Sequence, residues 1–264
     1  MSGGYIELSN VTVRRSGRTI LNVENLSIND GQFISLIGTN GAGKTTLLCV
    51  CCGLITPNTG SVKLDGINLT SLSGWHKVSL RKKIGYVPQS AEYNAELPFT
   101  VREVVSMGRT SVKRMCSPLN RRDYEIVDSW LEEMGLVERR NQTFRSLSGG
   151  ERQKVLIARA MTQQPTVLML DEPGSNLDFN WKQRIVDVVE KLHRRTSVTV
   201  LLVSHDVDLL PTDADRTILL HDGQILADGG GKEVFESEMF EKAYGCKFRV
   251  VDFEGRRYIL SCDR

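Results

Sequence analysis

The pattern of apolar and polar positions divides the chain into stretches of different predicted structure. Residues 5–30 alternate between apolar and polar positions and are interrupted by glycine turns, which predicts a layer of short antiparallel strands. Residues 33–37, 167–170 and 198–203 are short, predominantly apolar runs, typical of buried strands in a parallel sheet. The sequence therefore predicts an α/β domain that begins with an antiparallel layer.

A different pattern fills residues 90–145. Thr100 and Glu103 form a capping box, which predicts a helix that continues through Met107. Apolar residues recur with a helical period over residues 121–134. Because this stretch contains helical patterns and no convincing strand pattern, we interpret it as a helical insert in the α/β domain. Further elements are expected as helices at 47–54 and 181–194, strands at 59–64 and 81–89, and hairpins at 218–227 and 248–260.

Composition excludes some classes of function. Lys and Arg total 34 against 32 Asp and Glu, so the net charge of +2 predicts no strong field for nucleic acid, and no nucleic-acid partner is expected. No apolar run approaches the roughly 18–20 residues that cross a bilayer. The six cysteines contain no Cys-x-x-Cys pair, and Cys49, Cys51 and Cys52 fall in a predicted buried helix. We interpret them as reduced packing residues, which predicts a cytosolic location.

A glycine-rich stretch between a predicted strand and a predicted helix carries the strongest chemical signal. Glycines at 38, 41 and 43 allow the backbone N–H groups to turn toward phosphate oxygens, and the following helix directs its positive end at the same charge. Lys44 is expected to reach the β- and γ-phosphates and the Thr45 hydroxyl to bind Mg²⁺. The residues predicted to bind nucleotide here are Gly38, Thr39, Asn40, Gly41, Ala42, Gly43, Lys44, Thr45 and Thr46.

Two acidic residues follow the apolar run at 167–170. Asp171 ends the predicted strand, which would place its carboxylate beside the Mg²⁺ ion of a phosphate-loop protein. Glu172 would polarise a water molecule for attack on the γ-phosphate. The alternative for Glu172 is an acidic residue placed near a helix start by the helix dipole. The neighbouring Asp171 and the phosphate loop favour the catalytic interpretation.

A second possible anion site lies at residues 148–151. Ser148 and Glu151 form a capping box, so a helix is expected to begin here. Gly149 and Gly150 in its first turn are costly for a helix unless another group approaches the backbone closely. A helix N-terminus without side chains and with a free hydroxyl is an anion site. The chain therefore carries two phosphate-binding devices, which need not act on the same molecule.

The order of these motifs resembles that of the ATP-binding cassette (ABC) ATPases. Residues 147–153, Leu-Ser-Gly-Gly-Glu-Arg-Gln, are similar to the family's signature motif, and Asp171-Glu172 are similar to its Walker B motif. The remaining matches are Lys44 in Walker A, Gln89 in the Q-loop, Ser175-Asn176-Leu177-Asp178 in the D-loop and His205 in the H-loop. The resemblance implies one P-loop NTPase domain over residues 1–264. Residues 1–90 and 151–264 would form the core with its antiparallel β subdomain, and residues 91–150 an α-helical subdomain.

The resemblance also implies roles for individual residues. The nucleotide would lie between Walker A of one subunit and the signature of a second copy, whose Ser148, Gly149 and Gly150 would cap the γ-phosphate. Gln89 would contact Mg²⁺ or the attacking water, and His205 would contact the γ-phosphate and hold Glu172. Without the resemblance, Gln89 is a loop residue and His205 a structural one. Asp178 would communicate across the dimer, its alternative being a helix cap.

Two positions depart from the family pattern. Arg15 stands where an aromatic ring commonly stacks on adenine. A guanidinium also stacks on a base, so Arg15 remains a candidate nucleotide contact, with weaker purine discrimination expected. Gly174 stands where threonine is common, and we expect a minor effect.

The implied function is ATP hydrolysis coupled to import through a separate membrane permease. The segment 96–109 and the tail segments 231–235 and 244–250 are similar to those of importers of iron–siderophore complexes, haem and cobalamin. We therefore expect a metal chelate as cargo, with iron–siderophore first. The expected partners are a second copy, the permease and an extracytoplasmic substrate-binding protein, at the cytoplasmic face of the cell membrane. The alternatives are a soluble ABC ATPase for a task such as iron–sulfur cluster assembly and a nucleotide-binding module without turnover.

Overall fold

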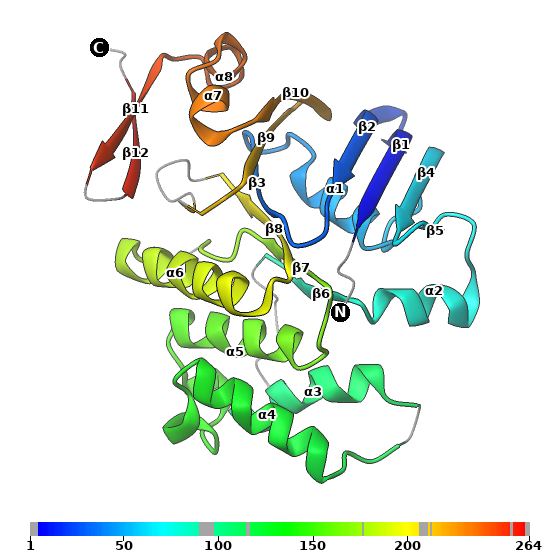
Figure 1. Cartoon of the computed structure of the whole chain (residues 1–264), viewed down its shortest axis with the longest axis vertical. Coiled ribbons are helices and arrows are strands. Elements are labelled where there is room, and N and C mark those ends of the chain that lie inside the picture. The colour runs from blue at the N-terminus through cyan, green and yellow to red at the C-terminus, as the bar shows by residue number, and fades with distance from the viewer. Residues whose placement is uncertain are drawn as a thin grey trace.

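The computed structural model describes residues 5–89, 98–114, 117–175, 177–205, 211, 213–253 and 256–261. Its central sheet is parallel except for the antiparallel edge strand β10 (Figure 1). In spatial order the strands are β10 (Gln224–Gly229), β9 (Arg216–His221), β3 (Phe33–Ile37), β8 (Thr199–Ser204), β7 (Val167–Asp171) and β6 (Ile84–Val87).

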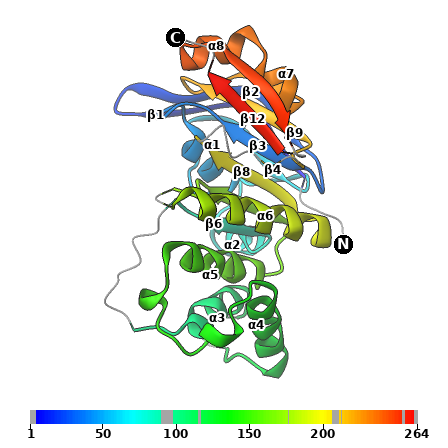
Figure 2. The same cartoon turned by 90° about the vertical axis from the view of Figure 1, so that its left-hand side faces the viewer.

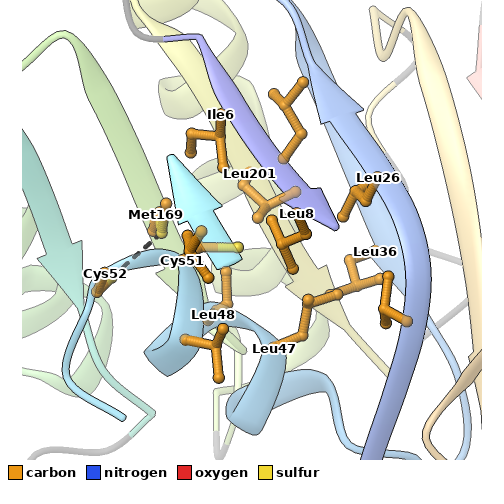
Figure 3. Close-up of a cluster of buried hydrophobic side chains, with 14 of the residues drawn as sticks. Ile6, Leu8, Leu26, Leu36, Leu47, Leu48, Cys51, Cys52, Met169 and Leu201 are labelled. Atoms are coloured by element: carbon orange, nitrogen blue, oxygen red, sulfur yellow. Dashed lines mark hydrogen bonds between the residues drawn. The ribbon is translucent and has the colours of Figure 1, made fainter. Parts of the chain in front are cut away.

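An antiparallel sheet formed largely by the N-terminal residues packs beside the central sheet. Its strands, in spatial order, are β2 (Arg18–Ile28), β1 (Ile6–Arg15), β4 (Thr59–Leu64) and β5 (Ile67–Asn68). Helix α1 (Lys44–Cys51) lies between the two sheets, and Figure 3 shows its Leu47, Leu48 and Cys51 facing residues of both. This cluster excludes water from both sheets at once, with each fully buried Leu contributing about 2 kcal/mol.

Four helices lie on the opposite side of the central sheet. They are α3 (Val101–Val112), α4 (Arg121–Glu133), α5 (Gly149–Met161) and α6 (Phe179–Thr196), with 3₁₀ turns at Val137–Arg139 and Phe144–Ser146. Their apolar residues join those of β6, β7 and β8 in a second buried cluster. Figure 2 shows α3 and α4 at one end of the molecule, with α5 between them and the sheet. No helix among the described residues combines the length and apolarity needed to cross a membrane.

The C-terminal segment forms a third layer at the other end (Figure 1). It consists of α7 (Gly231–Phe235), α8 (Glu238–Tyr244) and the hairpin of β11 (Phe248–Phe253) and β12 (Arg256–Ser261). Phe240 packs between Phe235 and Tyr244, and this aromatic cluster covers Ile37, the last residue of β3. The tail therefore supports the strand that leads into the phosphate loop.

Most elements expected from the sequence are confirmed, including the α/β class, the antiparallel layer, the helical stretch and both hairpins. Three boundaries were wrong. The helix expected at 47–54 ends at Cys51, and Leu54 is half exposed. The strand expected at 81–89 covers only Ile84–Val87, because α2 (Gly74–Arg81), which the sequence analysis did not predict, precedes it. The helix that opens at Thr100 continues past Met107 to Val112.

Candidate nucleotide-binding site

The phosphate loop joins β3 to α1 and is held by its neighbours through backbone contacts. Gly38 has a φ of 153°, and a Cβ atom there would lie 2.1 Å from the Leu220 carbonyl oxygen of β9, so only glycine fits. The turn of the β9–β10 hairpin holds the other end, because the Gly223 N–H donates to the Ala42 carbonyl at 3.0 Å. Neither contact involves a side chain, which leaves the loop's inner surface to the backbone and Lys44.

The N-terminus of α1 is open to a ligand. Its N-cap, Gly43, lies in the left-handed region with a φ of 100°, and no side chain caps the helix. The first N–H groups of a helix have no partners within it, so this end can bind an anion. It faces a cleft of about 640 Å³, whose described lining residues are Ile20, Asn40, Gly41, Ala42, Gly43, Lys44, Thr45, Thr46, Gln89, Glu172, Ser175, Lys182 and His205.

Lys44 is buried and held within the loop. Its Nζ donates to the carbonyl oxygens of Gly38 at 2.8 Å and Thr39 at 3.0 Å, and lies 3.7 Å from Glu172 Oε1. Burial lowers the pKa of Lys44, and the carboxylates of Glu172 and Asp171 oppose that shift. The ammonium group is therefore fixed beside the helix N-terminus, where it can meet a phosphate.

Asp171 lies at the end of β7, directly opposite the first turn of α1. Its Oδ1 accepts a hydrogen bond from Thr45 Oγ1 at 3.1 Å, and its Oδ2 accepts one from the Tyr86 hydroxyl at 3.4 Å. Burial raises the pKa of this carboxyl group, and the Thr45 hydrogen bond opposes the rise. Neighbouring hydroxyl and carboxylate oxygens are the donors that Mg²⁺ prefers, so Thr45 and Asp171 fit the predicted ion.

Glu172 is the meeting point of three motifs. Its Oε2 accepts a hydrogen bond from Gln89 Nε2 at 2.6 Å, and the Nδ1 atom of His205 lies 2.9 Å from the same oxygen. With Lys44 near Oε1, the four residues predicted to be catalytic lie together. The backbone of Glu172 has a φ of 47°. Residues other than glycine rarely adopt this left-handed conformation, and it often marks functional sites.

Two cleft residues, Ile20 and Lys182, were not indicated by the sequence, which indicated Ser175 only as part of the D-loop and not as a residue of the cleft. Lys182 comes from the first turns of α6, and its stem lies against Gly174. A Cβ atom on Gly174 would lie 3.2 Å from Lys182 Cγ, so a threonine there would press on the lysine. In the sequence, glycine in place of the common threonine at position 174 was the one sign of a close neighbour, but it did not indicate that this neighbour is Lys182.

The signature residues lie elsewhere. None of Ser148, Gly149 and Gly150 is among the described residues that line the cleft. The capping box is confirmed, since the Glu151 N–H donates to Ser148 Oγ at 3.3 Å and Glu151 Oε2 accepts from the Ser148 N–H at 3.0 Å. The free hydroxyl expected here was wrong, because Ser148 Oγ donates to Glu151 Oε2 at 3.0 Å. The three residues' contact with a phosphate stays a prediction.

The remaining candidates have contacts that their sequence motifs did not specify. Arg15 is exposed at the end of β1 and is not among the described residues that line the cleft, so its stacking on adenine stays a prediction. Asp178 is the N-cap of α6 and accepts from the Trp181 N–H at 2.9 Å, which is the structural alternative considered for it. Its D-loop neighbour Asn176 lies outside the described residues.

Comparison with known proteins identifies the family. The sequence model described as ABC transporter matches residues 21–175. The cobalamin import ATP-binding protein of Halobacterium salinarum is 35% identical over 246 residues, which cover 93% of this chain and 60% of that protein. The petrobactin import ATP-binding protein of Bacillus anthracis is 32% identical over 250 residues, covering 95% and 89%.

A solved structure agrees with these sequence matches. It is a dimeric ATP-binding cassette in a post-hydrolysis state bound to ADP and phosphate. The likeness has a TM-score of 0.73 at 30% identity and covers 84% of this chain and 97% of that one. The chain therefore belongs to the ABC transporter family, as an ATP-binding subunit that hydrolyses ATP for transport.

Proposed function

We propose that the chain is the ATPase subunit of an importer of metal chelates. In this proposal two copies face each other, and each copy's signature completes the other's ATP site. The observation that carries the catalytic part is the convergence of Lys44, Gln89 and His205 on the carboxylate of Glu172. A carboxylate oriented by two neighbours beside a phosphate loop suits a group that polarises water.

The proposed roles follow from the contacts of each side chain. Lys44 neutralises charge on the β- and γ-phosphates, which approach it along the N-terminus of α1. Thr45 and Asp171 would hold Mg²⁺ through their oxygen atoms, and the Gln89 amide would contact either the ion or the attacking water. His205 orients Glu172 and contacts the γ-phosphate.

A second copy is proposed because the chain's two phosphate-binding devices do not meet. The signature turn does not contribute to the described lining of the chain's own cleft. The related cassette described as dimeric with ADP and phosphate supports an arrangement in which the two devices meet across a dimer. Ser148 would then release Glu151 to donate its hydroxyl to the partner's phosphate.

The permease would dock beside Gln89. Pro98 and Phe99, which follow the Q-loop, are exposed and available for an apolar contact. Glu96 and Leu97 of the same segment lie outside the described residues. Relatives named for cobalamin import and petrobactin import support a chelate as cargo, and we place iron–siderophore ahead of haem and cobalamin. The subunit would then work at the cytoplasmic face of the membrane, with an extracytoplasmic substrate-binding protein supplying the cargo.

The substitution Glu172→Gln tests the catalytic part. The amide keeps the size of the side chain but loses the negative charge, so turnover should fall by roughly 10²–10³-fold while ATP binding is retained. Size-exclusion chromatography with light scattering should show an ATP-dependent dimer. The control is Glu125→Gln, an exposed carboxylate on α4 that pairs with Arg121. Turnover in Glu172→Gln equal to the control would remove Glu172 from this role.

Uptake measurements test the cargo and separate it from the soluble alternative. A strain without the gene should lose uptake of one of three labelled cargoes: ferric siderophore, haem or cobalamin. Unchanged uptake of all three, with loss of an unrelated solute, would overturn the chelate and leave the ATPase in place. Unchanged uptake of every solute, with no integral membrane protein co-purifying, would favour a soluble role such as iron–sulfur cluster assembly.

A further inference from the structure

Trp181, in the first turn of α6, packs directly against the signature turn at the start of α5. A Cβ atom on Gly150 would lie 2.1 Å from Trp181 Cε3 and 2.2 Å from Cδ2. Such distances are far shorter than any van der Waals contact, so the indole ring occupies the space that a side chain at position 150 would need. The close approach that Gly150 requires is therefore made, in this chain, by its own Trp181.

Leu177 makes a similar contact with Gly149, the residue before Gly150. A Cβ atom on Gly149 would lie 2.8 Å from Leu177 Cδ2. Leu177 and Trp181 thus back both signature glycines, and we call the pair the signature platform. Leu177 directly precedes Asp178, the N-cap of α6, and Trp181 lies in the first turn of that helix, so the start of α6 forms the platform.

The platform is held in place from both sides. The Trp181 N–H donates to Asp178 Oδ1 at 2.9 Å, which fixes the start of α6. Lys154 Nζ lies 5.8 Å from the centroid of the Trp181 ring and Arg184 Cζ lies 5.1 Å from it. Cations near an aromatic face attract it electrostatically, so the ring is held between α5 and α6 and does not turn freely.

The same platform continues into the catalytic cleft. Backbone hydrogen bonds join the Ser175 N–H to the Glu172 carbonyl at 3.0 Å and the Leu177 N–H to the Gly174 carbonyl at 3.2 Å. Ser175 also lines the cleft. A compact turn thus connects Glu172 to the surface that supports the signature glycines of the same chain.

We propose that Trp181 is a positioning residue that sets the signature turn and couples it to the segment following Glu172. A nucleotide that moves the cleft-lining turn would move the signature turn presented to the second copy. The inference rests on the proposed function, because the signature turn has a ligand only in the dimer.

A size exchange in the Glu172→Gln background tests the contact. Gly150→Ala should clash with the ring and weaken ATP-dependent dimerisation by about tenfold, and Trp181→Leu should weaken it several-fold by removing the support. Combining them should restore dimerisation several-fold over Gly150→Ala alone, because leucine leaves room for the new methyl group. Trp181→Phe, which keeps an aromatic ring, should stay within about threefold of the background.

Two further measurements distinguish positioning from simple packing. Nucleotide affinity of the monomers should stay within about twofold in every variant, since the P-loop is untouched. Trp75→Leu is the matched control, because Trp75 is 74% exposed on α2 and should change nothing. Circular dichroism and the unfolding midpoint check that each variant folds. If Trp181→Leu does not fold, Trp181→Phe still tests whether an aromatic ring at this position supports dimerisation.

The outcomes separate the inference from the function on which it rests. Independent, multiplying effects of Gly150→Ala and Trp181→Leu would overturn the coupling, as would dimerisation of Trp181→Leu equal to that of Trp75→Leu. If Glu172→Gln itself does not associate with ATP, the proposed dimer is overturned and the inference falls with it. Association of Glu172→Gln with and without Trp181→Leu to the same extent overturns the inference alone.

Discussion

Helices α1 and α5 both begin at a glycine-rich turn, and their N-termini are completed in different ways. At α1 no side chain caps the helix, and the groups around the turn are Lys44, Asp171 and Glu172 of the same chain. At α5 the Ser148 hydroxyl and the Glu151 carboxylate cap the helix reciprocally. The first turn is thus open toward a cleft equipped for phosphate chemistry, whereas the second is already occupied by the chain's own carboxylate.

In the proposed dimer, this difference would let one chain carry two anion sites that do not compete for the same nucleotide. The positive end of a helix attracts phosphate, but a carboxylate already bound there reduces that attraction. In the proposed function, the P-loop end would therefore bind nucleotide first, within one copy. The α5 end is supported by Trp181, and an incoming phosphate would have to displace Glu151 from the Ser148 hydroxyl. ATP-loaded copies would supply that phosphate to each other.

The largest effect is expected when the phosphate loop at the start of α1 loses its lysine. Lys44→Ala removes the buried ammonium group that lies beside the phosphate loop, so turnover should fall by more than about 100-fold and ATP affinity should drop. Lys182→Ala is the comparison, since Lys182 lines the same cleft from α6 and should cost less than about tenfold. Steady-state phosphate release and nucleotide titration measure both. Equal losses for the two lysines would contradict the special place of Lys44.

A second prediction concerns the stability of the helical segment that precedes the signature turn. Asp123 is buried on α4 and accepts hydrogen bonds from Arg109, Lys113 and the Asn120 N–H. Asp123→Asn leaves these two cations without their anion, so the free energy of unfolding should fall by about 2–3 kcal/mol. Nucleotide affinity at the P-loop should be unchanged. Asp128→Asn, in an exposed pair with Arg102, is the control and should cost less than about 1 kcal/mol.

The same carboxylate gives a pH dependence with a definite sign. The hydrogen bond from the Asn120 N–H, followed by that from Lys113, lowers the pKa of Asp123 to about 2 in the folded chain. Because the folded pKa lies below the ordinary value near 4, Asp123 stabilises the fold above pH ~4 and loses this contribution between pH ~4 and ~2. Urea unfolding across this window should be less steep in pH for Asp123→Asn than for the parent. Identical slopes would contradict this account.

The smallest expected effect concerns the signature turn at the start of α5 and the charge of Glu151. The hydrogen bond from the Ser148 N–H is the main cause that keeps the pKa of Glu151 below its ordinary value, so the side chain is an anion at neutral pH. Glu151→Gln keeps the capping box and removes the charge, and should tighten ATP-dependent association of the Glu172→Gln protein by about twofold to fivefold. Glu151→Ala, which loses the box as well, is the comparison. Weaker association of Glu151→Gln, measured by ATP titration, would contradict competition by the carboxylate.

Local patterns predicted much of this molecule, and contacts between distant segments were the main omissions. The phosphate loop and both capping boxes depend on neighbours within a few residues, so spacing alone specified them. The packing of Trp181 against Gly150 depends on how α5 and α6 are arranged, which spacing does not reveal. The Ser148 hydroxyl was also wrongly expected to be free. A capping box in the sequence predicts where the helix starts, but it does not predict that the hydroxyl donates to the capping carboxylate.

Mixing two inactive variants tests the central claim most directly. Lys44→Ala disables a copy's own P-loop, and Ser148→Arg disables the signature that the copy offers to its partner. In a heterodimer one composite site keeps an intact lysine and an intact signature, so an equimolar mixture should recover about a quarter of the parental turnover if one site suffices. Recovery well above either variant alone is the predicted result. A mixture that stays inactive, while mixtures of parent with each variant remain active, would contradict the shared site.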